Sequence, residues 1–281
     1  MSKTRRYPFL TVCIIVILIF IGLVVLLSEI DRHYSYHVSL SQMYKEQPLR
    51  PILGVYNCII RASKKCVPFP SLDENFPDHK RFEQQWQQIA QEALNVYQTQ
   101  KLPAFHEIHE IFNDISASNK TWTVFMLKWY DNPIHANMLK CPITANLIKT
   151  TPQVQAAMFS ILQPGTKIPP HRGPACNSLR YHLGLKIPKP SNKNNSNSGR
   201  ARIRIDKTWY FWKEGEGVLF DDTYEHEVIN DTNEIRIVLF MDVLRPLPIG
   251  INYINKLLVK HANISEFVST INSRAEVQEK L

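Results

Sequence analysis

Eight short runs rich in aromatic and β-branched residues, beginning near Trp122, constrain the fold more than any other feature of this chain. They are TWTVFMLKWY, AAMFSIL, LRYHLGLKI, ARIRI, TWYFW, GVLFDD, HEVI and EIRIVLFMDV. Turn-forming stretches such as QPGT, KEGEG and INDTNE separate them, and a polar stretch from Pro190 to Arg200 reads as a surface loop. Short runs broken by turns are typical of antiparallel strands. The sequence therefore predicts a β-sandwich or a barrel.

Helices are predicted on both sides of these runs. Apolar residues recur at three- and four-residue spacing from about His79 to Gln100, with Asp78 as a candidate N-cap and Pro103 beyond the end. The C-terminal stretch NYINKLLVKHANISEFV predicts a basic amphipathic helix, which either packs on the barrel or rests on lipid. Of these two placements, packing on the barrel is favoured.

The N-terminal part of the chain contains an uncharged apolar run from Phe9 to Leu27. Its length is close to the roughly 20 residues of a membrane-spanning helix, and no small-residue cleavage site follows it. We expect a single transmembrane anchor. Basic residues on both sides of the run give only a weak preference for a domain outside the cytoplasm.

The charge balance indicates what the protein binds. The formal net charge is +8 and the isoelectric point is near 9.2. Beside an anchor, an anionic bilayer is a simpler partner than nucleic acid, which we do not expect. The segment PILGVYNCII, followed by Arg61, Lys64 and Lys65, forms either an interfacial amphipathic element or a solvated basic loop. The five cysteines contain no CxxC pair, so they indicate neither a zinc site nor a disulfide framework.

A cation and an imidazole share one face of the run Leu179–Ile187. Strand alternation places the apolar residues on one face and Arg180 with His182 on the other. Gly184 in the same run permits close approach of backbone or ligand. These residues line either a polar pocket for an anion or a solvent-facing strand edge.

A second arginine, Arg236, lies in a run that is apolar on both faces, so we expect it to be partly buried. Alternation groups it with Val238, Phe240 and Asp242. A buried guanidinium needs a partner, and a carboxylate matches its geometry best. The partner is either a protein group such as Asp221 or Asp222, or a bound dicarboxylate.

Two histidines are candidate metal ligands. His171 lies in PPHRGP before the strand that holds Arg180, and His226 lies in DDTYEHEV after GVLF. Imidazole suits Fe(II), and non-haem iron oxygenases often combine two histidines with one carboxylate. The order of a histidine, a second histidine some fifty residues later and an arginine ten residues after that is similar to that of the double-stranded β-helix oxygenases.

The stretches FSILQPGTKIPPHRGPACNSLRYHLGLKIP and WKEGEGVLFDDTYEHEVINDTNEIRIVLFMDVLRP, with LKWYDNP and CPIT upstream, resemble the aspartyl/asparaginyl β-hydroxylase family of Fe(II)/2-oxoglutarate dioxygenases. The likeness covers roughly Trp122 to Pro246. The short N-terminal anchor, LKWY and LRYHLGL are most similar to its bacterial branch, the lipid A 2-hydroxylases. The resemblance implies a mainly β double-stranded β-helix of the cupin or jelly-roll type, with N-terminal helices and one transmembrane helix.

The same resemblance assigns roles to individual residues. His171 and His226 match the iron ligands, and Arg236 matches the arginine that binds the C5 carboxylate of 2-oxoglutarate. Ser160, Arg180 and His182 match further co-substrate contacts. Gly173 stands where most such sites carry an acid; a glycine there is expected in the peptide hydroxylases, whereas an aspartate is more usual in the lipid branch.

The implied reaction couples oxidation of 2-oxoglutarate by O2 to hydroxylation of a C–H bond at Fe(II), and no side chain beyond the metal centre is needed as a catalyst. The leading substrate is the 2-position of a lipid A acyl chain. The alternatives are an Asp or Asn side chain in a peptide, which Gly173 favours, and a non-catalytic binding module, which is disfavoured because the chain carries His171, His226 and Arg236 together.

These expectations divide the chain and place it in the cell. We expect a membrane anchor over residues 1–28, a juxtamembrane segment over 29–78, the oxygenase domain over 79–248 and a C-terminal tail over 249–281. Because Fe(II) and 2-oxoglutarate are cytosolic metabolites, the expected location is a bacterial inner membrane with the domain on its cytoplasmic face. In a eukaryotic host it is the lumen of the endoplasmic reticulum.

Overall fold

The computed structural model describes residues 7–35, 50–108, 116, 122–130, 132–173, 175–189, 199–262, 271 and 273–279. The chain divides into two compact units. The N-terminal unit comprises residues 1–65 with 173–176, and the β unit comprises residues 66–172 with 177–281. Most of the polar stretch from Pro190 to Arg200 lies outside the described residues.

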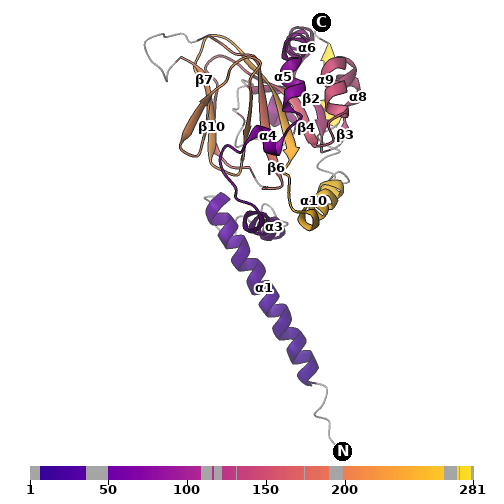
Figure 1. Ribbon diagram of the computed structural model, residues 1–281, viewed down its shortest axis with the longest axis vertical. Helices are drawn as coiled ribbons and strands as arrows, with labels where there is room; N and C mark the ends of the chain where they lie inside the picture. The colour runs from indigo at the N-terminus through magenta and orange to yellow at the C-terminus, as the bar shows by residue number, and fades with distance from the viewer. Residues whose placement is uncertain are drawn as a thin grey trace, which may run out of the picture. The chain divides into compact units, whose positions relative to one another are not determined.

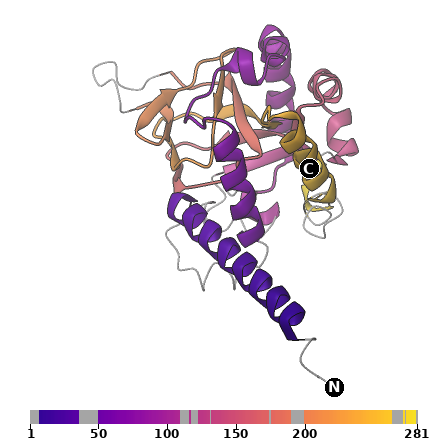
Figure 2. The same ribbon diagram turned by 60° about the horizontal axis from the view of Figure 1, so that its bottom comes forward.

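The N-terminal unit is built from two helices, α1 (Tyr7–Ser35) and α3 (Arg50–Ser63), which lie side by side in both ribbon views (Figures 1 and 2). Helix α3 buries Tyr56, Asn57 and Ile60, while its Ile59 is exposed. The segment PILGVYNCII is therefore an amphipathic helix, and the alternative of a solvated loop is wrong. Its placement at a membrane interface stays a prediction.

Helix α1 contains the apolar run in which we expected a transmembrane anchor. Many of its large apolar side chains are exposed, among them Ile19 and Phe20. Within the part of the chain that the structure describes, however, no helix reaches the length and hydropathy required to cross a membrane. The predicted span from Phe9 to Leu27 is not confirmed.

Two antiparallel sheets form the centre of the β unit (Figure 1). In the larger sheet the strand order is β3-β2-β4-β11-β6-β9, and in the smaller it is β5-β10-β7-β8. The strands are β2 (Trp122–Trp129), β3 (Asn132–Pro133), β4 (Val154–Leu162), β5 (Lys167–His171), β6 (Ser178–Lys186), β7 (Ala201–Ile205), β8 (Thr208–Phe211), β9 (Gly217–Phe220), β10 (His226–Asn230) and β11 (Arg236–Leu244). A separate short pair joins β1 (Gln100–Lys101) to β12 (Gln278–Glu279).

From β4 to β11 the chain passes back and forth between the two sheets, except at the β7–β8 hairpin, which stays within the smaller sheet. Strands β4, β6, β9 and β11 belong to the larger sheet, while β5, β7 and β10 belong to the smaller one. This alternation is the connectivity of a jelly roll, the double-sheet architecture shared by cupins. The prediction of a mainly β fold with two antiparallel sheets is confirmed.

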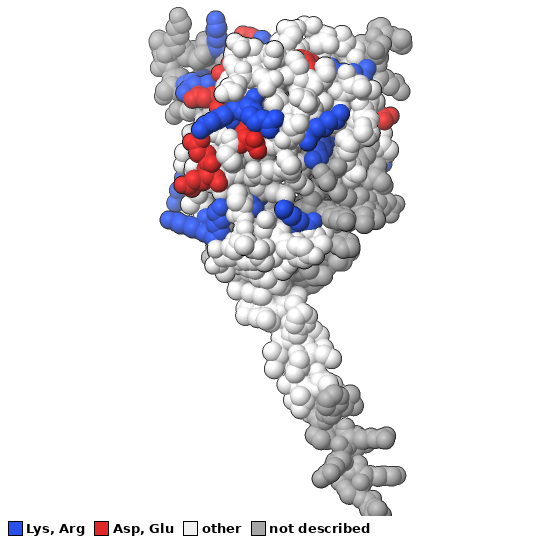
Figure 3. Space-filling view, turned by 45° about the vertical axis from the view of Figure 1, so that its right-hand side comes forward, with Lys and Arg blue, Asp and Glu red and all other residues white. Residues whose placement is uncertain are grey.

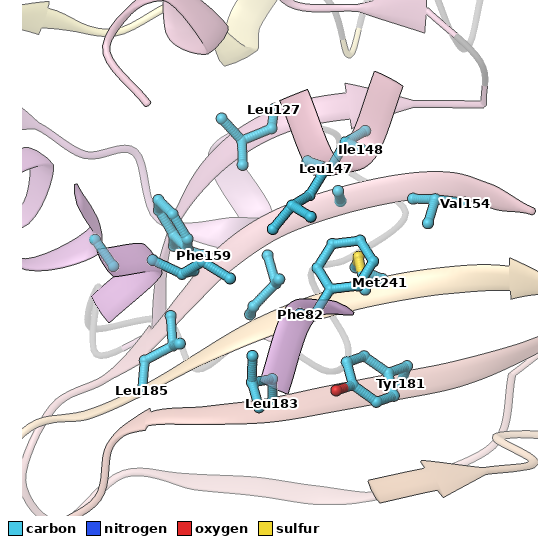
Figure 4. Close-up of a cluster of buried hydrophobic side chains, with 14 of the residues drawn as sticks. Phe82, Leu127, Leu147, Ile148, Val154, Phe159, Tyr181, Leu183, Leu185 and Met241 are labelled. Atoms are coloured by element: carbon cyan, nitrogen blue, oxygen red, sulfur yellow. The ribbon is translucent and has the colours of Figure 1, made fainter. Parts of the chain in front are cut away.

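The larger sheet is buried on both faces because helices cover one face and the smaller sheet covers the other. Helices α5 (His79–Gln84), α6 (Trp86–Thr99) and α9 (Pro142–Lys149) pack on the outer face, where Phe82, Phe159 and Met241 contribute to a continuous apolar cluster (Figure 4). A second cluster, which includes Phe220 and Phe240, fills the space between the sheets. Alternation in β11 therefore places Leu239 toward the helices and Arg236 toward the space between the sheets.

The single helix predicted from His79 to Gln100 is two helices that meet at Gln85. Gln85 leaves the helical conformation, with φ −110° and ψ 15°. Asp78 does occupy the N-cap position of α5, but its side chain makes no capping hydrogen bond and pairs with Arg81 instead. The apolar spacing predicted the buried face because both helices bury the same side against the sheet. The remaining short helices are α4 (Leu72–Asn75), α7 (Phe105–Ile108) and α8 (His135–Leu139).

The predicted C-terminal helix is α10 (Ile249–Ala262). It attaches through Asn255, which is buried and whose Nδ2 donates a hydrogen bond to the carbonyl of Asn177 at 3.1 Å. The opposite side of the helix exposes the apolar side chains Ile249, Tyr253, Ile254 and Leu257, which we call the α10 stripe. The helix therefore packs on the β unit through one side only.

Some charged side chains on the surface are arranged in pairs. Arg202 pairs with Asp231 at 2.9 Å, and Arg204 bonds to Glu225 at 3.0 Å on the outer face of the smaller sheet. On the face shown in Figure 3, Lys and Arg groups lie beside Asp and Glu groups with uncharged surface between them. The positive charge is therefore not gathered into one continuous patch on that face.

Candidate active site

His171 and His226 are brought together by neighbouring strands. His171 is the last residue of β5, His226 is the first residue of β10, and the two are paired in the antiparallel register. Their ring centroids lie 4.0 Å apart. Some fifty residues separate them in the sequence, but the fold places them on paired strands of the smaller sheet.

Each imidazole is oriented by a backbone carbonyl two residues earlier. Nδ1 of His171 lies 2.8 Å from the carbonyl of Pro169, and Nδ1 of His226 lies 2.9 Å from that of Tyr224. A carbonyl only accepts, so in both rings Nδ1 carries the proton and donates. The lone pair is therefore on Nε2 of each ring, in the orientation that metal-binding histidines adopt when a backbone oxygen fixes the tautomer.

Both rings are held in the neutral form that metal binding requires. Burial lowers the pKa of His171 to about 4. The positive charge of Arg180 also lowers this pKa, whereas the hydrogen bond to Pro169 raises it. Burial, followed by the proximity of His171, lowers the pKa of His226 well below its usual value. At neutral pH neither ring has to lose a proton before it can bind a metal.

Arg236 is a buried cation without a carboxylate partner among the described residues. It is 1% exposed, and Nη1 donates to the carbonyl of Ser160 at 3.1 Å and to its hydroxyl at 3.5 Å. Its Nε is buried without an acceptor in the part of the chain that is described. Burial lowers the pKa of Arg236 to about 9, which shows that the charged form is poorly compensated.

Both protein partners considered for Arg236 bind other arginines. Asp221 forms a buried ion pair with Arg245, and it also accepts from the Thr223 hydroxyl at 2.7 Å. Asp222 pairs with Arg180 at 3.1 Å. Neither of these aspartates is therefore the partner of Arg236, and its binding of a dicarboxylate stays a prediction.

His182 and Ser160 lie on the same inner surface of the larger sheet as Arg236. His182 is opposite Phe240 on β11, and Ser160 is opposite Val238. Both ring nitrogens of His182 are buried without hydrogen-bond partners among the described residues. Burial, with the positive charge of Arg236, lowers the pKa of His182 well below its usual value, so the ring is neutral. Ser160 accepts from Trp122 Nε1 at 3.0 Å, which leaves its hydroxyl hydrogen available to donate.

Arg180 lies on the predicted polar face of β6, which points into the space between the sheets and not to solvent. Its guanidinium pairs with both Asp222 and Asp242, the latter at 3.0 Å, and it stacks on Phe240 with its Cζ 4.3 Å from the ring centroid. Burial raises the pKa of Asp222 to about 6 despite this pairing. Because two carboxylates already surround Arg180, it is a weaker candidate than Arg236 for binding an anion.

Two features of the site were not predicted from the sequence. Asp242 was grouped on the face of Arg236 but was given no role, although it holds Arg180. Trp212, which follows β8, is buried with Arg236 over its ring and His182 beside it. The available signal was its position as the last residue of the aromatic run TWYFW, directly before the KEGEG turn. At Gly184 the sequence left open a close approach of backbone or of ligand, and the structure confirms the backbone alternative: the carbonyl of Lys213 fills the space where a Cβ would stand.

The residues fit a metal held by two protein ligands. No group of three or more His, Cys, Asp or Glu side chains suited to a metal ion occurs within the described ranges. Gly173, two residues after His171, has no side chain that could serve as a third ligand. The donor set consists of the two neutral imidazoles, so the other coordination positions would be open to small molecules.

The comparison with known proteins agrees with this geometry. The sequence model of the family "Aspartyl/Asparaginyl beta-hydroxylase" matches residues 83–246, which include all six predicted site residues. The chain is 35% identical over 194 residues to the ornithine lipid ester-linked acyl 2-hydroxylase of Rhizobium tropici, covering 69% of this chain and 66% of that protein. It is 32% identical over 176 residues to the human aspartyl/asparaginyl β-hydroxylase, covering 59% of this chain and 21% of the human protein.

Among solved structures, the cupin domain of an XRE-family transcriptional regulator from Enterobacter cloacae aligns with a TM-score of 0.30 and 13% identity, covering 45% of this chain and 99% of that one. A similarity at this level has no bearing on function. The family match spans more than half of the chain and contains both histidines and Arg236. The chain belongs to the aspartyl/asparaginyl β-hydroxylase family.

Proposed function

We propose that this protein is an Fe(II)- and 2-oxoglutarate-dependent hydroxylase that acts on carbon 2 of an acyl chain in a membrane lipid. One observation carries the proposal: a buried guanidinium without a carboxylate partner among the described residues lies on the inner surface of the same pair of sheets as two neutral, adjacent histidines. A dicarboxylate that also chelates a metal would satisfy both features at once.

His171 and His226 would hold the iron through Nε2. Their Nδ1 hydrogen bonds to Pro169 and Tyr224 fix the ring orientation, and their low pKa values remove competition from protons. The bound iron would supply the oxidising chemistry, in which O2 and 2-oxoglutarate are consumed and a C–H bond of the substrate is hydroxylated. With two protein ligands, positions remain for the co-substrate and O2.

Arg236, Ser160 and His182 would bind 2-oxoglutarate. The Nε of Arg236 and the hydroxyl hydrogen of Ser160 are available for the far carboxylate, which would compensate the buried charge. His182 would contribute one donor or acceptor from its neutral ring. Arg180, held by Asp222 and Asp242, would act on the histidines at a distance, because its positive charge lowers the pKa of both His171 and His226.

The substrate class rests on similarity and on one surface feature. The matched R. tropici protein is named for hydroxylation of a lipid acyl chain at the position that we propose here. The α10 stripe gives the β unit an exposed apolar surface, and the helix contains Lys256 but no acidic residue. An apolar helix face bordered by lysine and free of negative charge is suited to the interface of an anionic bilayer. We therefore place the substrate in a membrane lipid, with lipid A and an ornithine lipid as specific candidates.

A peptide substrate is the second candidate. The human relative is named for hydroxylation of aspartyl and asparaginyl residues, and Gly173 agrees with that branch. Both candidates use the same iron and co-substrate site, so the identity of the hydroxylated molecule is what distinguishes them.

Product analysis tests the proposal. The purified full-length chain is incubated with Fe(II), 2-oxoglutarate and 18O2. Lipid A, an ornithine lipid and an Asp/Asn-containing peptide are each added as the substrate in a separate reaction. We expect one 18O atom on carbon 2 of a lipid acyl chain. Labelling of the peptide alone would replace the lipid proposal with the peptide one, and labelling of none of the three by a folded chain would favour a non-catalytic binding module.

A further inference from the structure

The indole of Trp212 is the least explained polar group near the proposed co-substrate site. Trp212 is 2% exposed, and its Nε1–H has no acceptor among the described residues. Nearly all buried polar groups in folded proteins have a hydrogen-bond partner, because leaving one without a partner costs about 1–3 kcal/mol. An orphaned indole N–H therefore indicates an acceptor that the protein itself does not supply.

The side chains beside Trp212 also contain buried polar atoms that have no hydrogen-bond partner among the described residues. The Arg236 Cζ lies 4.7 Å from the centroid of the Trp212 ring, and the His182 ring centroid lies 5.8 Å from it. Arg236 Nε and both nitrogens of His182 are also buried without partners in the described part of the chain. Four orphaned polar atoms thus belong to three adjacent side chains, which come from β6, β11 and the segment after β8.

The missing acceptor has a defined chemistry. Tryptophan and arginine only donate, and His182 can donate from one nitrogen in its neutral form. The guanidinium also has no carboxylate partner among the described residues, and burial lowers its pKa to about 9. A water molecule would accept hydrogen bonds but would leave the charge uncompensated. A carboxylate offers about four acceptor positions and the missing charge.

We infer that Trp212 is a co-substrate-binding residue, whose Nε1–H donates to the same carboxylate that Arg236 binds. The ring also stacks on the guanidinium and limits its orientations. This inference rests on the proposed use of 2-oxoglutarate. Because the indole would contact only the far carboxylate, Trp212 would favour dicarboxylates over 2-oxo acids that have a single carboxylate.

The indole N–H can be observed directly. The chain contains five tryptophans, so a 15N-labelled sample has five indole signals in an NMR spectrum. Zn(II) replaces Fe(II) to give a diamagnetic, unreactive site, and 2-oxoglutarate is titrated in. The Trp212 signal is the one that is absent from the spectrum of Trp212→Phe. If Trp212→Phe does not fold, each of the other tryptophans is replaced in turn, and the Trp212 signal is the one that none of these replacements removes. We expect it to shift with 2-oxoglutarate and not with pyruvate, which lacks the second carboxylate.

The dissociation constant gives an independent readout. Trp212→Phe keeps the aromatic ring but removes the donor, so 2-oxoglutarate should bind about 10- to 100-fold more weakly, the equivalent of one hydrogen bond to a charged group. Trp209→Phe is the matched control: Trp209 lies in β8, is 36% exposed and stacks on Arg202, and its loss should leave the constant unchanged. Zn(II) affinity should be the same in all three chains.

The possible failures are distinguishable. If the wild-type chain and Trp209→Phe bind 2-oxoglutarate while the Trp212 signal stays in place and Trp212→Phe binds equally well, the inference about Trp212 is overturned and the proposed function stands. If the wild-type chain with Zn(II) bound does not bind 2-oxoglutarate at all, the proposed function fails, and the inference fails with it.

Discussion

The rings of His171 and His226 lie 4.0 Å apart at the paired ends of β5 and β10, and each donates its Nδ1 proton to the carbonyl two residues before it. The same local arrangement thus occurs on two antiparallel strands. It presents two nitrogen lone pairs from neighbouring rings, which is the minimum that a metal site needs.

Removal of either histidine should abolish tight metal binding. We expect His171→Ala and His226→Ala to bind Co(II) at least about 100-fold more weakly than the wild-type chain, since loss of a ligand should exceed the 10- to 100-fold effect of losing a group that only supports a ligand. Absorption titration measures the affinity. His135→Ala, an exposed histidine on α8, should bind Co(II) normally. Equal affinity in all four chains would exclude this pair as the metal site.

Two buried arginines should respond oppositely to replacement by methionine. Arg236 has no carboxylate partner among the described residues, so Arg236→Met should raise the free energy of unfolding of the ligand-free chain by about 1–3 kcal/mol. Arg245 pairs with buried Asp221, so Arg245→Met should lower it by about 3–5 kcal/mol. Urea denaturation measures both. A loss of stability in Arg236→Met comparable to that in Arg245→Met would show that Arg236 is compensated within the protein.

The stability of the metal-free chain should fall at mildly acidic pH, partly because of His171. Its pKa is about 4 in the folded state against 6.5 without the protein environment, so the unfolded chain binds more protons between these values. The contribution of His171 is fully present above pH 6.5 and is lost as the pH falls toward 4. Asp222 acts in the opposite direction, because its pKa is raised from 3.8 to about 6 and its contribution falls as pH rises through that range.

The contribution of His171 is therefore isolated by comparison with a variant. Urea denaturation of His171→Gln between pH 7.5 and 5 should show a weaker loss of stability than the wild-type chain, whereas His135→Gln should follow the wild-type profile. Parallel profiles for His171→Gln and the wild-type chain would mean that His171 titrates alike in the folded and unfolded states.

Gly184 should tolerate no side chain. A Cβ there would stand 2.1 Å from the carbonyl oxygen of Lys213, a backbone atom that also pairs with the following turn. Gly184→Ala should therefore lower the free energy of unfolding by at least about 2 kcal/mol. At Gly250, in the first turn of α10, a Cβ meets nothing within 4 Å, so Gly250→Ala should be neutral or stabilising by up to about 1 kcal/mol. A small loss of stability in Gly184→Ala would show that the turn at Lys213 can move to make room for a Cβ at little cost in free energy.

The α10 stripe should contact lipid if the substrate is a membrane lipid. Tyr253→Trp places a fluorophore on the stripe, and we expect its added emission to be quenched by vesicles of anionic phospholipid with brominated acyl chains. Leu139→Trp is the matched control, since Leu139 is 82% exposed on a different helix, α8. Its added emission should not be quenched. Equal responses of the two variants would remove the argument from α10 for a lipid surface.

Strand periodicity predicted much of this architecture. Alternation in β11 correctly separated Leu239 from Arg236, and the two histidines selected from the sequence lie together on neighbouring strands. The helix break at Gln85 could not be read from apolar spacing, because the spacing continues across it. The partners of Arg180 were also out of reach, since Asp222 and Asp242 come from a loop and from a strand some sixty residues away.

Other expectations depend on more than local pattern. Trp212 belongs to a run that reads as strand, and its importance becomes visible only from what its ring touches. The roles assigned to the six site residues, the segment boundaries and the cellular location stay predictions. The location in particular depends on the surroundings of the chain and not on its internal contacts.

Release of labelled succinate and CO2 from 2-oxoglutarate tests the central claim most directly. The purified chain with Fe(II) and O2 should release both when supplied with its lipid substrate, and His226→Ala should release neither, while His135→Ala should match the wild-type chain. Release that is unchanged in His226→Ala, or a folded, iron-loaded wild-type chain that never consumes 2-oxoglutarate with lipid or peptide, would contradict the account.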